Sequence, residues 1–182
     1  MSIIKLHDLN FTPFISEKEL SEIVSSLVKK VSMDLDPNEI PIFIGILNGS
    51  FLFAADFIRK YTQNCEVSFV KLSSYKGTTS TEVVNELIGI NEDITGRTIV
   101  ILEDIIDTGS TLHKIYDCFK NKQVKQLKIA TLFFKPDVYK KELPIDYIGK
   151  SIEDKFIVGY GLDYNGLGRN LPAVYQLTTE AT

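Results

Sequence analysis

The chain has 182 residues, of which 44% are hydrophobic and 24% charged, and its formal net charge is −4 at pH 7. This length and composition are typical of one soluble globular domain with an ordinary core. The negative charge argues against a nucleic-acid partner, because a dedicated nucleic-acid binder needs a basic face that neutralises phosphates.

Cysteine usage and hydropathy point to the compartment. Cys65 and Cys118 are far apart in the sequence and have no CxxC spacing, which argues against a disulfide framework or a zinc site. The first residues lack the continuous apolar region of a signal peptide, and no stretch approaches the roughly 18 apolar residues of a membrane span. We therefore expect a cytoplasmic protein without a membrane partner.

The first predicted elements are a helix, a buried strand, a second helix and a second strand. Ser16-Glu17-Lys18-Glu19 forms a capping box, which predicts a helix start. Apolar residues follow at helical spacing, namely Leu20, Ile23, Val24, Leu27, Val28 and Val31. The continuous apolar run 41–47 predicts a strand buried on both faces. Residues 51–61 predict a helix, and residues 66–74 a strand.

The middle of the chain continues this alternation. The small polar residues 76–81 predict a mobile loop, followed by a returning strand at 83–90. A buried strand at 97–102, a helix at 110–121 and a strand at 128–134 come next, and short strand-like segments follow at 147–148, 156–158 and 173–177. Buried strands that alternate with helices predict an α/β fold: a parallel twisted sheet with helices on both faces. Without repeats or a linker, residues 1–182 are expected to form a single domain.

The stretch from Ile99 to Thr111 carries the chemistry. A buried strand is followed by the adjacent acids Glu103 and Asp104, and then by Asp107-Thr108-Gly109-Ser110-Thr111 at a predicted helix start. In open α/β sheets, ligands bind outside the carboxyl ends of the strands. A helix N-terminus offers free N–H groups, to which Thr108, Ser110 and Thr111 would add hydroxyl groups, and Gly109 allows close approach. This pattern predicts a cradle for one phosphate group.

A phosphate bound beside three carboxylates would be repelled by them unless a neutral or cationic group lies in between. Ribose hydroxyls can donate hydrogen bonds to paired carboxylates, and a hard cation such as Mg²⁺ can offset their charge. These residues therefore suggest a phosphorylated sugar with a divalent ion. A simpler interpretation is that Asp107 caps the helix while Glu103 and Asp104 are solvated loop acids. The co-occurrence of the strand, the three acids and the Thr-Gly-Ser-Thr turn within this short stretch favours the functional interpretation.

The segment Glu103-Asp104-Ile105-Ile106-Asp107-Thr108-Gly109 resembles the 5-phosphoribosyl-1-pyrophosphate motif of type I phosphoribosyltransferases, in particular their hypoxanthine-guanine branch. The resemblance implies a core at about 38–135 and a small hood, the lobe over the active site, built from about 1–15 and 136–182. It also implies that Glu103 and Asp104 bind ribose and that residues 107–111 bind the 5′-phosphate. Asp107 would be the catalytic proton-handling group at N7 of the base.

Two further segments resemble loops of that family. The first, Gly45-Ile46-Leu47-Asn48-Gly49-Ser50, resembles its pyrophosphate loop, in which a non-proline cis peptide turns backbone amides toward the pyrophosphate. By position that bond is Leu47–Asn48, and Leu47, Asn48 and Gly49 would bind pyrophosphate. Many members carry lysine where this chain has Asn48. The second segment is Ser74-Tyr75, which the resemblance places on a flexible loop that closes over the site.

The C-terminal part resembles the segments of the family that bind the base. The resemblance implies that Lys135 lies near the purine 6-oxygen, that Phe156 stacks on the purine and that the backbone of Ile157 pairs with the base edge. Asp163, in the stretch Phe156 to Tyr164, would lie at the base and, with Glu103 and Asp104, would hold Mg²⁺. Arg169 would reach pyrophosphate.

The resemblance implies purine salvage: the 5-phosphoribosyl group of phosphoribosyl pyrophosphate would be transferred to N9 of hypoxanthine, and of guanine, giving IMP or GMP and pyrophosphate. It also implies a homodimer or homotetramer. Three alternatives stay open at this point: a phosphoribosyltransferase for xanthine or another base, an RNA-binding regulator on the same fold, and a receiver-type phosphoacceptor domain. The last would need neither the Thr-Gly-Ser-Thr turn nor the base-binding segment.

Overall fold

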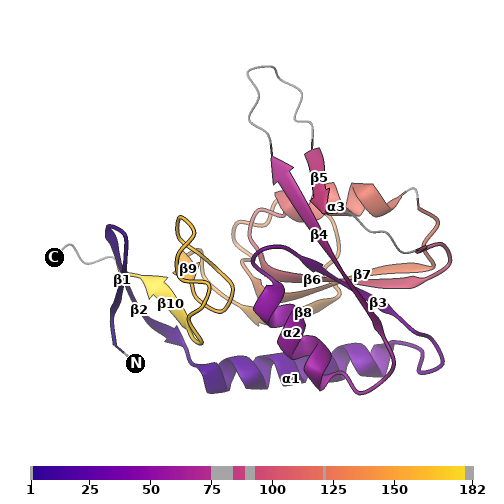
Figure 1. Ribbon diagram of the computed structural model, residues 1–182, viewed down its shortest axis with the longest axis horizontal. Helices are drawn as coiled ribbons and strands as arrows, with labels where there is room; N and C mark the ends of the chain where they lie inside the picture. The colour runs from indigo at the N-terminus through magenta and orange to yellow at the C-terminus, as the bar shows by residue number, and fades with distance from the viewer. Residues whose placement is uncertain (1, 75–83, 89–92, 121, 179–182) are drawn as a thin grey trace.

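In the computed structural model, a large sheet and a small sheet lie side by side (Figure 1). The structure describes residues 2–74, 84–88, 93–120 and 122–178. The large sheet has six strands in the order β5-β4-β3-β6-β7-β8, and the small one has four in the order β1-β2-β10-β9. No helix within the described ranges has the length and apolar character that crossing a bilayer would require.

Five strands of the large sheet are parallel. They are β3 (Ile42–Ile46), β4 (Glu66–Ser74), β6 (Thr98–Ile106), β7 (Gln126–Phe134) and β8 (Tyr147–Ser151). Strand β5 (Val84–Ile88) returns antiparallel to β4 at the edge. The parallel arrangement brings the carboxyl ends of β3, β6 and β7 to one edge of the sheet, which is where ligands bind in such folds.

Helices cover both faces of this sheet, as the alternation of buried strands and helices predicts. On one face, α1 (Glu17–Asp34) and α2 (Phe51–Lys60) pack on Phe43, Val100 and Leu102. On the other, α3 (Ser110–Lys120) packs on side chains of the same strands that point the opposite way, including Ile44 and Ile101. Strands buried on both sides explain the continuous apolar runs of the sequence.

The helix start that the capping-box pattern predicts is confirmed, with Ser16 as its N-cap, and the Glu19 side chain accepts a hydrogen bond from Lys150. The Ser16 hydroxyl accepts a hydrogen bond from the Glu19 amide at 3.2 Å, which satisfies one of the free N–H groups of the first turn. The apolar stripe of this helix is buried as its spacing predicts, at Leu20, Val24, Leu27, Val28 and Val31.

The hood is an antiparallel sheet made from both ends of the described chain. It consists of β1 (Ile4–Leu6), β2 (Leu9–Ile15), β9 (Ile157–Val158) and β10 (Val174–Leu177), and β2 pairs directly with β10. A small apolar cluster around Phe11 and Val158 lies beneath it. Strand β8, within the range 136–182 expected for the hood, instead extends the large sheet.

Candidate active site

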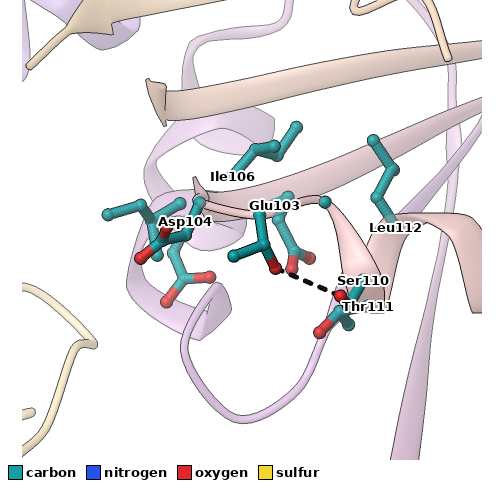
Figure 2. A pocket seen from close by; sticks show the side chains of 10 residues that line it. Glu103, Asp104, Ile106, Ser110, Thr111 and Leu112 are labelled. Atoms are coloured by element: carbon teal, nitrogen blue, oxygen red, sulfur yellow. Dashed lines mark hydrogen bonds between the residues drawn. The ribbon is translucent and has the colours of Figure 1, made fainter. Parts of the chain in front are cut away.

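The phosphate cradle lies where β6 meets α3. A cavity of about 250 Å³ is lined by residues 103–112, and Figure 2 shows Ser110 and Thr111 at the first turn of α3. The hydroxyls of Thr108 and Ser110 are 3.1 Å apart and form a hydrogen bond. Gly109 has φ +79°, and a Cβ there would lie 2.5 Å from the Tyr139 ring, so the turn requires glycine for both conformation and space.

The two acids of the motif are buried, which corrects the sequence interpretation. The predicted strand ended at Leu102 with Glu103 and Asp104 at its end, but β6 runs to Ile106, and the two side chains are only 6% and 8% exposed. Pairing with β7 continues through Ile105 and Ile106, so the backbone stays in the sheet past both acids. The acids therefore form part of the wall of the cavity and are not solvated loop residues.

Burial sets the electrostatics of this pair. Desolvation raises the pKa of Glu103 well above its ordinary value, and the neighbouring charge of Asp104 adds to the effect. Desolvation also raises the pKa of Asp104, to about 6, against the opposing effects of backbone N–H donors and of Arg169. Oε2 of Glu103 has no hydrogen-bond partner among the described residues. A buried carboxylate oxygen without a partner is costly, and a ligand hydroxyl or cation would relieve that cost.

The loop between β3 and α2 lies against Asp104. The Leu47–Asn48 peptide is cis, as the motif predicts, and the Asn48 side chain is exposed. Gly49 lies against Asp104, since an added Cβ would be 1.8 Å from Oδ2 of that residue. The loop is therefore in direct contact with one of the two buried acids.

Arg169 lies next to this loop, anchored in the hood. Its guanidinium donates to the carbonyl oxygen of Gly161 at 2.7 Å and forms an ion pair with Asp163 at 2.5 Å. The side chain is 28% exposed. This fixes a positive charge near the loop, where a negatively charged ligand can reach it.

A second cavity, of about 290 Å³, adjoins the cradle and shares residues with it, including Asp104 and Asp107. Its other lining residues come from the ends of β3 and β7 and from the hood, and they include Gly49, Lys135, Lys155, Phe156, Ile157, Leu162, Asp163 and Arg169. The Lys135 side chain is buried, and its ammonium donates to Asp107 and to Asp154, each at 3.0 Å. The cavity thus contains a buried cation beside an apolar wall.

The apolar wall is formed by Phe156, which is 44% exposed and partly supported from behind. The Phe11 ring lies 6.1 Å from it, and the Tyr164 ring meets it edge-on at 5.9 Å. Asp8 accepts a hydrogen bond from the Tyr164 hydroxyl and so holds that ring in place. A half-exposed aromatic face held by two other rings is suited to stacking against a flat ligand.

Comparison with known proteins decides the family. Residues 16–165 match the family model described as a phosphoribosyl transferase domain. The chain belongs to the phosphoribosyltransferase family. It is 39% identical to the hypoxanthine-guanine phosphoribosyltransferase of Streptococcus pneumoniae over 167 residues, which is 91% of this chain and 92% of that protein. The enzyme of the same name from Staphylococcus epidermidis is 37% identical and is covered to 93%.

Solved structures agree with this assignment to the hypoxanthine-guanine branch. A crystal structure of a hypoxanthine-guanine phosphoribosyltransferase from Bacillus anthracis matches with a TM-score of 0.85 and 38% identity, covering 97% of this chain and all of that one. A hypoxanthine phosphoribosyltransferase from Staphylococcus aureus matches with a TM-score of 0.84 and 35% identity, covering 91% and 90%. The fold expected from the resemblance is confirmed.

The structure of this phosphoribosyltransferase brings nearly all of the sequence-predicted site residues to one edge. Residues 103–104 and 107–111 line the cradle, while Lys135, Phe156, Ile157, Asp163 and Arg169 line the adjoining cavity. Gly49 links the pyrophosphate loop to both. Ser74 is the last residue of β4, and Tyr75 falls outside the described residues, as does the predicted loop that follows it.

The proposed metal ligands of the phosphoribosyltransferase, Glu103, Asp104 and Asp163, do not form a ready-made metal cage. Within the described ranges, no group of three or more His, Cys, Asp or Glu side chains is arranged to hold a metal ion. Mg²⁺ seldom needs such a cage, because it keeps several waters and binds one or two carboxylates together with substrate phosphates. The unpartnered buried oxygen of Glu103 and the all-oxygen donor set fit that mode of binding.

The sequence interpretation missed several residues that this phosphoribosyltransferase places at the site. Ile105, Lys155 and Leu162 line the second cavity, and Asp154 contacts Lys135. The only local signal for Asp154 and Lys155 is their position directly before Phe156. A run of charges before a strand is more often a solvated turn, so this signal is weak.

Proposed function

We propose that this phosphoribosyltransferase salvages 6-oxopurines by transferring the 5-phosphoribosyl group of phosphoribosyl pyrophosphate to N9 of hypoxanthine or guanine, giving IMP or GMP and pyrophosphate. The observation that carries the proposal is the pair of adjoining cavities, one with a phosphate cradle and one with a buried cation beside an aromatic wall. Their shared residues Asp104 and Asp107 lie at the junction, where the ribose joins the phosphate to the base.

The sugar phosphate is bound from β6 and α3. Residues 107–111 bind the 5′-phosphate through the free N–H groups at the start of α3 and the hydroxyls of Thr108, Ser110 and Thr111. Glu103 and Asp104 accept hydrogen bonds from the ribose hydroxyls. Anchoring both parts of the sugar phosphate converts remote binding energy into positioning of C1.

The leaving pyrophosphate is stabilised from the opposite side. Backbone groups of Leu47, Asn48 and Gly49 face it, and Arg169 contributes positive charge. Glu103, Asp104 and Asp163 would hold Mg²⁺ together with the substrate, and the ion would supply further charge stabilisation for the leaving group. Because C1 becomes oxocarbenium-like as pyrophosphate departs, charge stabilisation on the leaving oxygens lowers the barrier.

The base is bound between the large sheet and the hood. Phe156 stacks on the purine, the backbone of Ile157 and the carboxylate of Asp163 face its edge, and Lys135 donates to the 6-oxygen. An ammonium group can only donate hydrogen bonds, so Lys135 selects an oxo group over the amino group of adenine. Asp107 accepts the proton that N7 of the purine loses as N9 bonds to C1 and pyrophosphate leaves.

The protein is proposed to act in the cytoplasm as a homodimer or homotetramer. The chain has two cysteines, Cys65 and Cys118, far apart in the sequence, and this usage suits a reducing compartment. Phe51 and Leu52, at the start of α2, are partly exposed apolar side chains beside the pyrophosphate loop, and such side chains suit a contact with another copy.

The test is release of pyrophosphate from phosphoribosyl pyrophosphate with Mg²⁺ and each purine in turn. Hypoxanthine and guanine are expected to support release, and adenine is not. Competition between hypoxanthine, guanine and xanthine then ranks the bases. Lack of release with all four purines would rule out the proposed function, and release with xanthine alone would reassign the substrate.

A further inference from the structure

Three consecutive strand ends place a carboxylate, an ammonium group and a second carboxylate in a row. Asp107 directly follows β6, Lys135 directly follows β7, and Asp154 lies three residues beyond the end of β8. These strands are neighbours in the sheet in that order, so Lys135 is the central member of the row.

Backbone hydrogen bonds beyond the strands hold this row in register. The Lys135 amide donates to the carbonyl oxygen of Ile106 at 3.0 Å, and the Ile152 amide donates to the carbonyl oxygen of Phe134 at 2.9 Å. The first bond joins Lys135 itself to the residue before Asp107. The second joins the residue before Lys135 to a residue two positions before Asp154. The Ile152 side chain is also buried in the main core, which anchors the turn that carries Asp154.

The row leaves the lysine with one donor to spare. Its ammonium has three N–H groups, and within the described structure it donates to Oδ2 of Asp107 and Oδ1 of Asp154. The lysine side chain is 7% exposed, whereas the two carboxylates are 47% and 56% exposed. The cation is therefore the buried member of the row. One carboxylate from each neighbouring strand end fixes its orientation, and it lines the second cavity, which is proposed to bind the base.

We propose that Asp154 is a positioning residue for the purine base, an inference that rests on the proposed function. Asp107 must turn to N7 when a base is bound, and it can then no longer serve as the full counter-charge of Lys135. Asp154 does not take part in the proton transfer at N7. It keeps the buried ammonium compensated and directed, so that the third N–H meets the 6-oxygen of the purine.

The neighbouring acid offers a matched control. Glu153 precedes Asp154 in the same turn, is 78% exposed and pairs with Lys155 at 3.2 Å. Glu153→Gln therefore removes the same charge one residue away without removing a contact of Lys135. Asp154→Asn removes the charge and keeps an oxygen acceptor, Asp154→Ala removes both, and Asp154→Glu retains a carboxylate.

The experiment measures steady-state kinetics of the full chain with hypoxanthine and with phosphoribosyl pyrophosphate varied separately, alongside Tm. Because a hydrogen bond to a charged group is lost, we expect Asp154→Ala to raise the KM for hypoxanthine about ten-fold or more, and Asp154→Asn to raise it by a large part of that. The KM for phosphoribosyl pyrophosphate should stay within about two-fold in both. Asp154→Glu should recover part of the loss, and Glu153→Gln should match the wild type.

Several outcomes would overturn the inference. It fails if Asp154→Asn retains the wild-type KM for hypoxanthine, because an uncharged acceptor would then suffice. It also fails if both substrates weaken equally together with Tm, because that pattern marks a loss of folding, or if Glu153→Gln has the same effect as Asp154→Asn. A wild-type protein that is inactive with every purine would instead remove the proposed function itself.

Discussion

The backbone of Gly161 lies directly against the carbonyl group of Gly49, so closely that a Cβ added at Gly161 would be 2.0 Å from that oxygen. This contact joins the hood to the pyrophosphate loop. The same glycine accepts the hydrogen bond of Arg169 through its carbonyl oxygen. Gly161, which has no side chain, therefore links the pyrophosphate loop, the hood and the Arg169 side chain.

Gly161→Ala should displace the pyrophosphate loop or the hood. We expect kcat/KM for phosphoribosyl pyrophosphate to fall by about ten-fold or more, since a shift of about 1 Å in a positioned site can cost that much. Gly96→Ala is the matched control: Gly96 also has positive φ, but an added Cβ would meet nothing within 4 Å. Equal kinetic losses in the two variants would mean that backbone strain alone, and not the contact with Gly49, is responsible.

Asp107→Asn tests the proton-handling role. The amide keeps a similar shape and an acceptor for Lys135, so the pocket should persist. We expect turnover to fall at least about ten-fold, because general acid–base help is typically worth 10²–10⁴-fold. Direct titration should show that phosphoribosyl pyrophosphate still binds. A fully active variant would exclude this residue from proton transfer.

Lys135→Met tests selection of the oxo group. The wild type should use hypoxanthine far better than adenine, and the variant should lose most activity with hypoxanthine while its activity with adenine stays low. The two carboxylates left without the lysine are about half exposed, so water can solvate them and the fold should survive. The measurement is the ratio of kcat/KM for the two bases. Equal use of both bases by the wild type would contradict the assignment.

Thr111→Ala tests the phosphate cradle. Loss of a hydroxyl that donates to a phosphate should weaken binding of IMP by about ten-fold, because hydrogen bonds to charged groups are stronger than neutral ones. Inosine, which has the same base and sugar without the phosphate, should bind the variant and the wild type alike. The comparison needs only equilibrium titrations of the two ligands. An equal loss for inosine would indicate a disturbed pocket instead.

Asp34, outside the site, should make stability depend on pH. Hydrogen bonds from Lys128 and then from Tyr147 lower the pKa of its carboxyl group in the folded protein. A lowered folded pKa contributes stability above the unfolded pKa of about 3.9, and this contribution is lost as the pH falls through the folded value.

Asp34→Asn should therefore be less stable than the wild type at pH 7, with a gap that closes as the pH falls below about 4. The effect should be modest, because the carboxylate is half exposed. Urea denaturation at several pH values measures it. A gap that stays constant down to pH 2 would mean that the charge of Asp34 does not contribute.

The sequence predicted the large sheet well because its strands carry local signals. Continuous apolar runs marked β3 and β6, and the capping box marked α1. The hood had weaker signals. Strands β1 and β2 were not predicted, since β2 contains Pro13 and pairs with β10, about 160 residues away in the sequence. Strand β10 was predicted from its own residues, but its pairing with β2 was not, because pairing over that distance has no local signal in the sequence.

In the site as well, residues that are contiguous in the sequence could be predicted, and contacts made by the fold could not. The phosphate cradle is contiguous in sequence, so residues 107–111 could be assigned from their pattern alone. The burial of Glu103 and Asp104 could not, because charged residues rarely continue a buried strand, and here pairing with β7 overrides that preference. Asp154 contacts Lys135 only because β7 and β8 are neighbours, which spacing along the chain does not reveal.

The row at the ends of β6, β7 and β8 also constrains how this protein could evolve toward a different base. Replacing the lysine would leave two half-exposed carboxylates to be solvated by water, and replacing either acid would change how the buried cation is balanced. Because replacing the lysine alone should not create activity with a 6-aminopurine, a change of base preference would involve residues in three separate stretches of the sequence. Purine preference is thus protected from single mutations by the way adjacent strands share one charge.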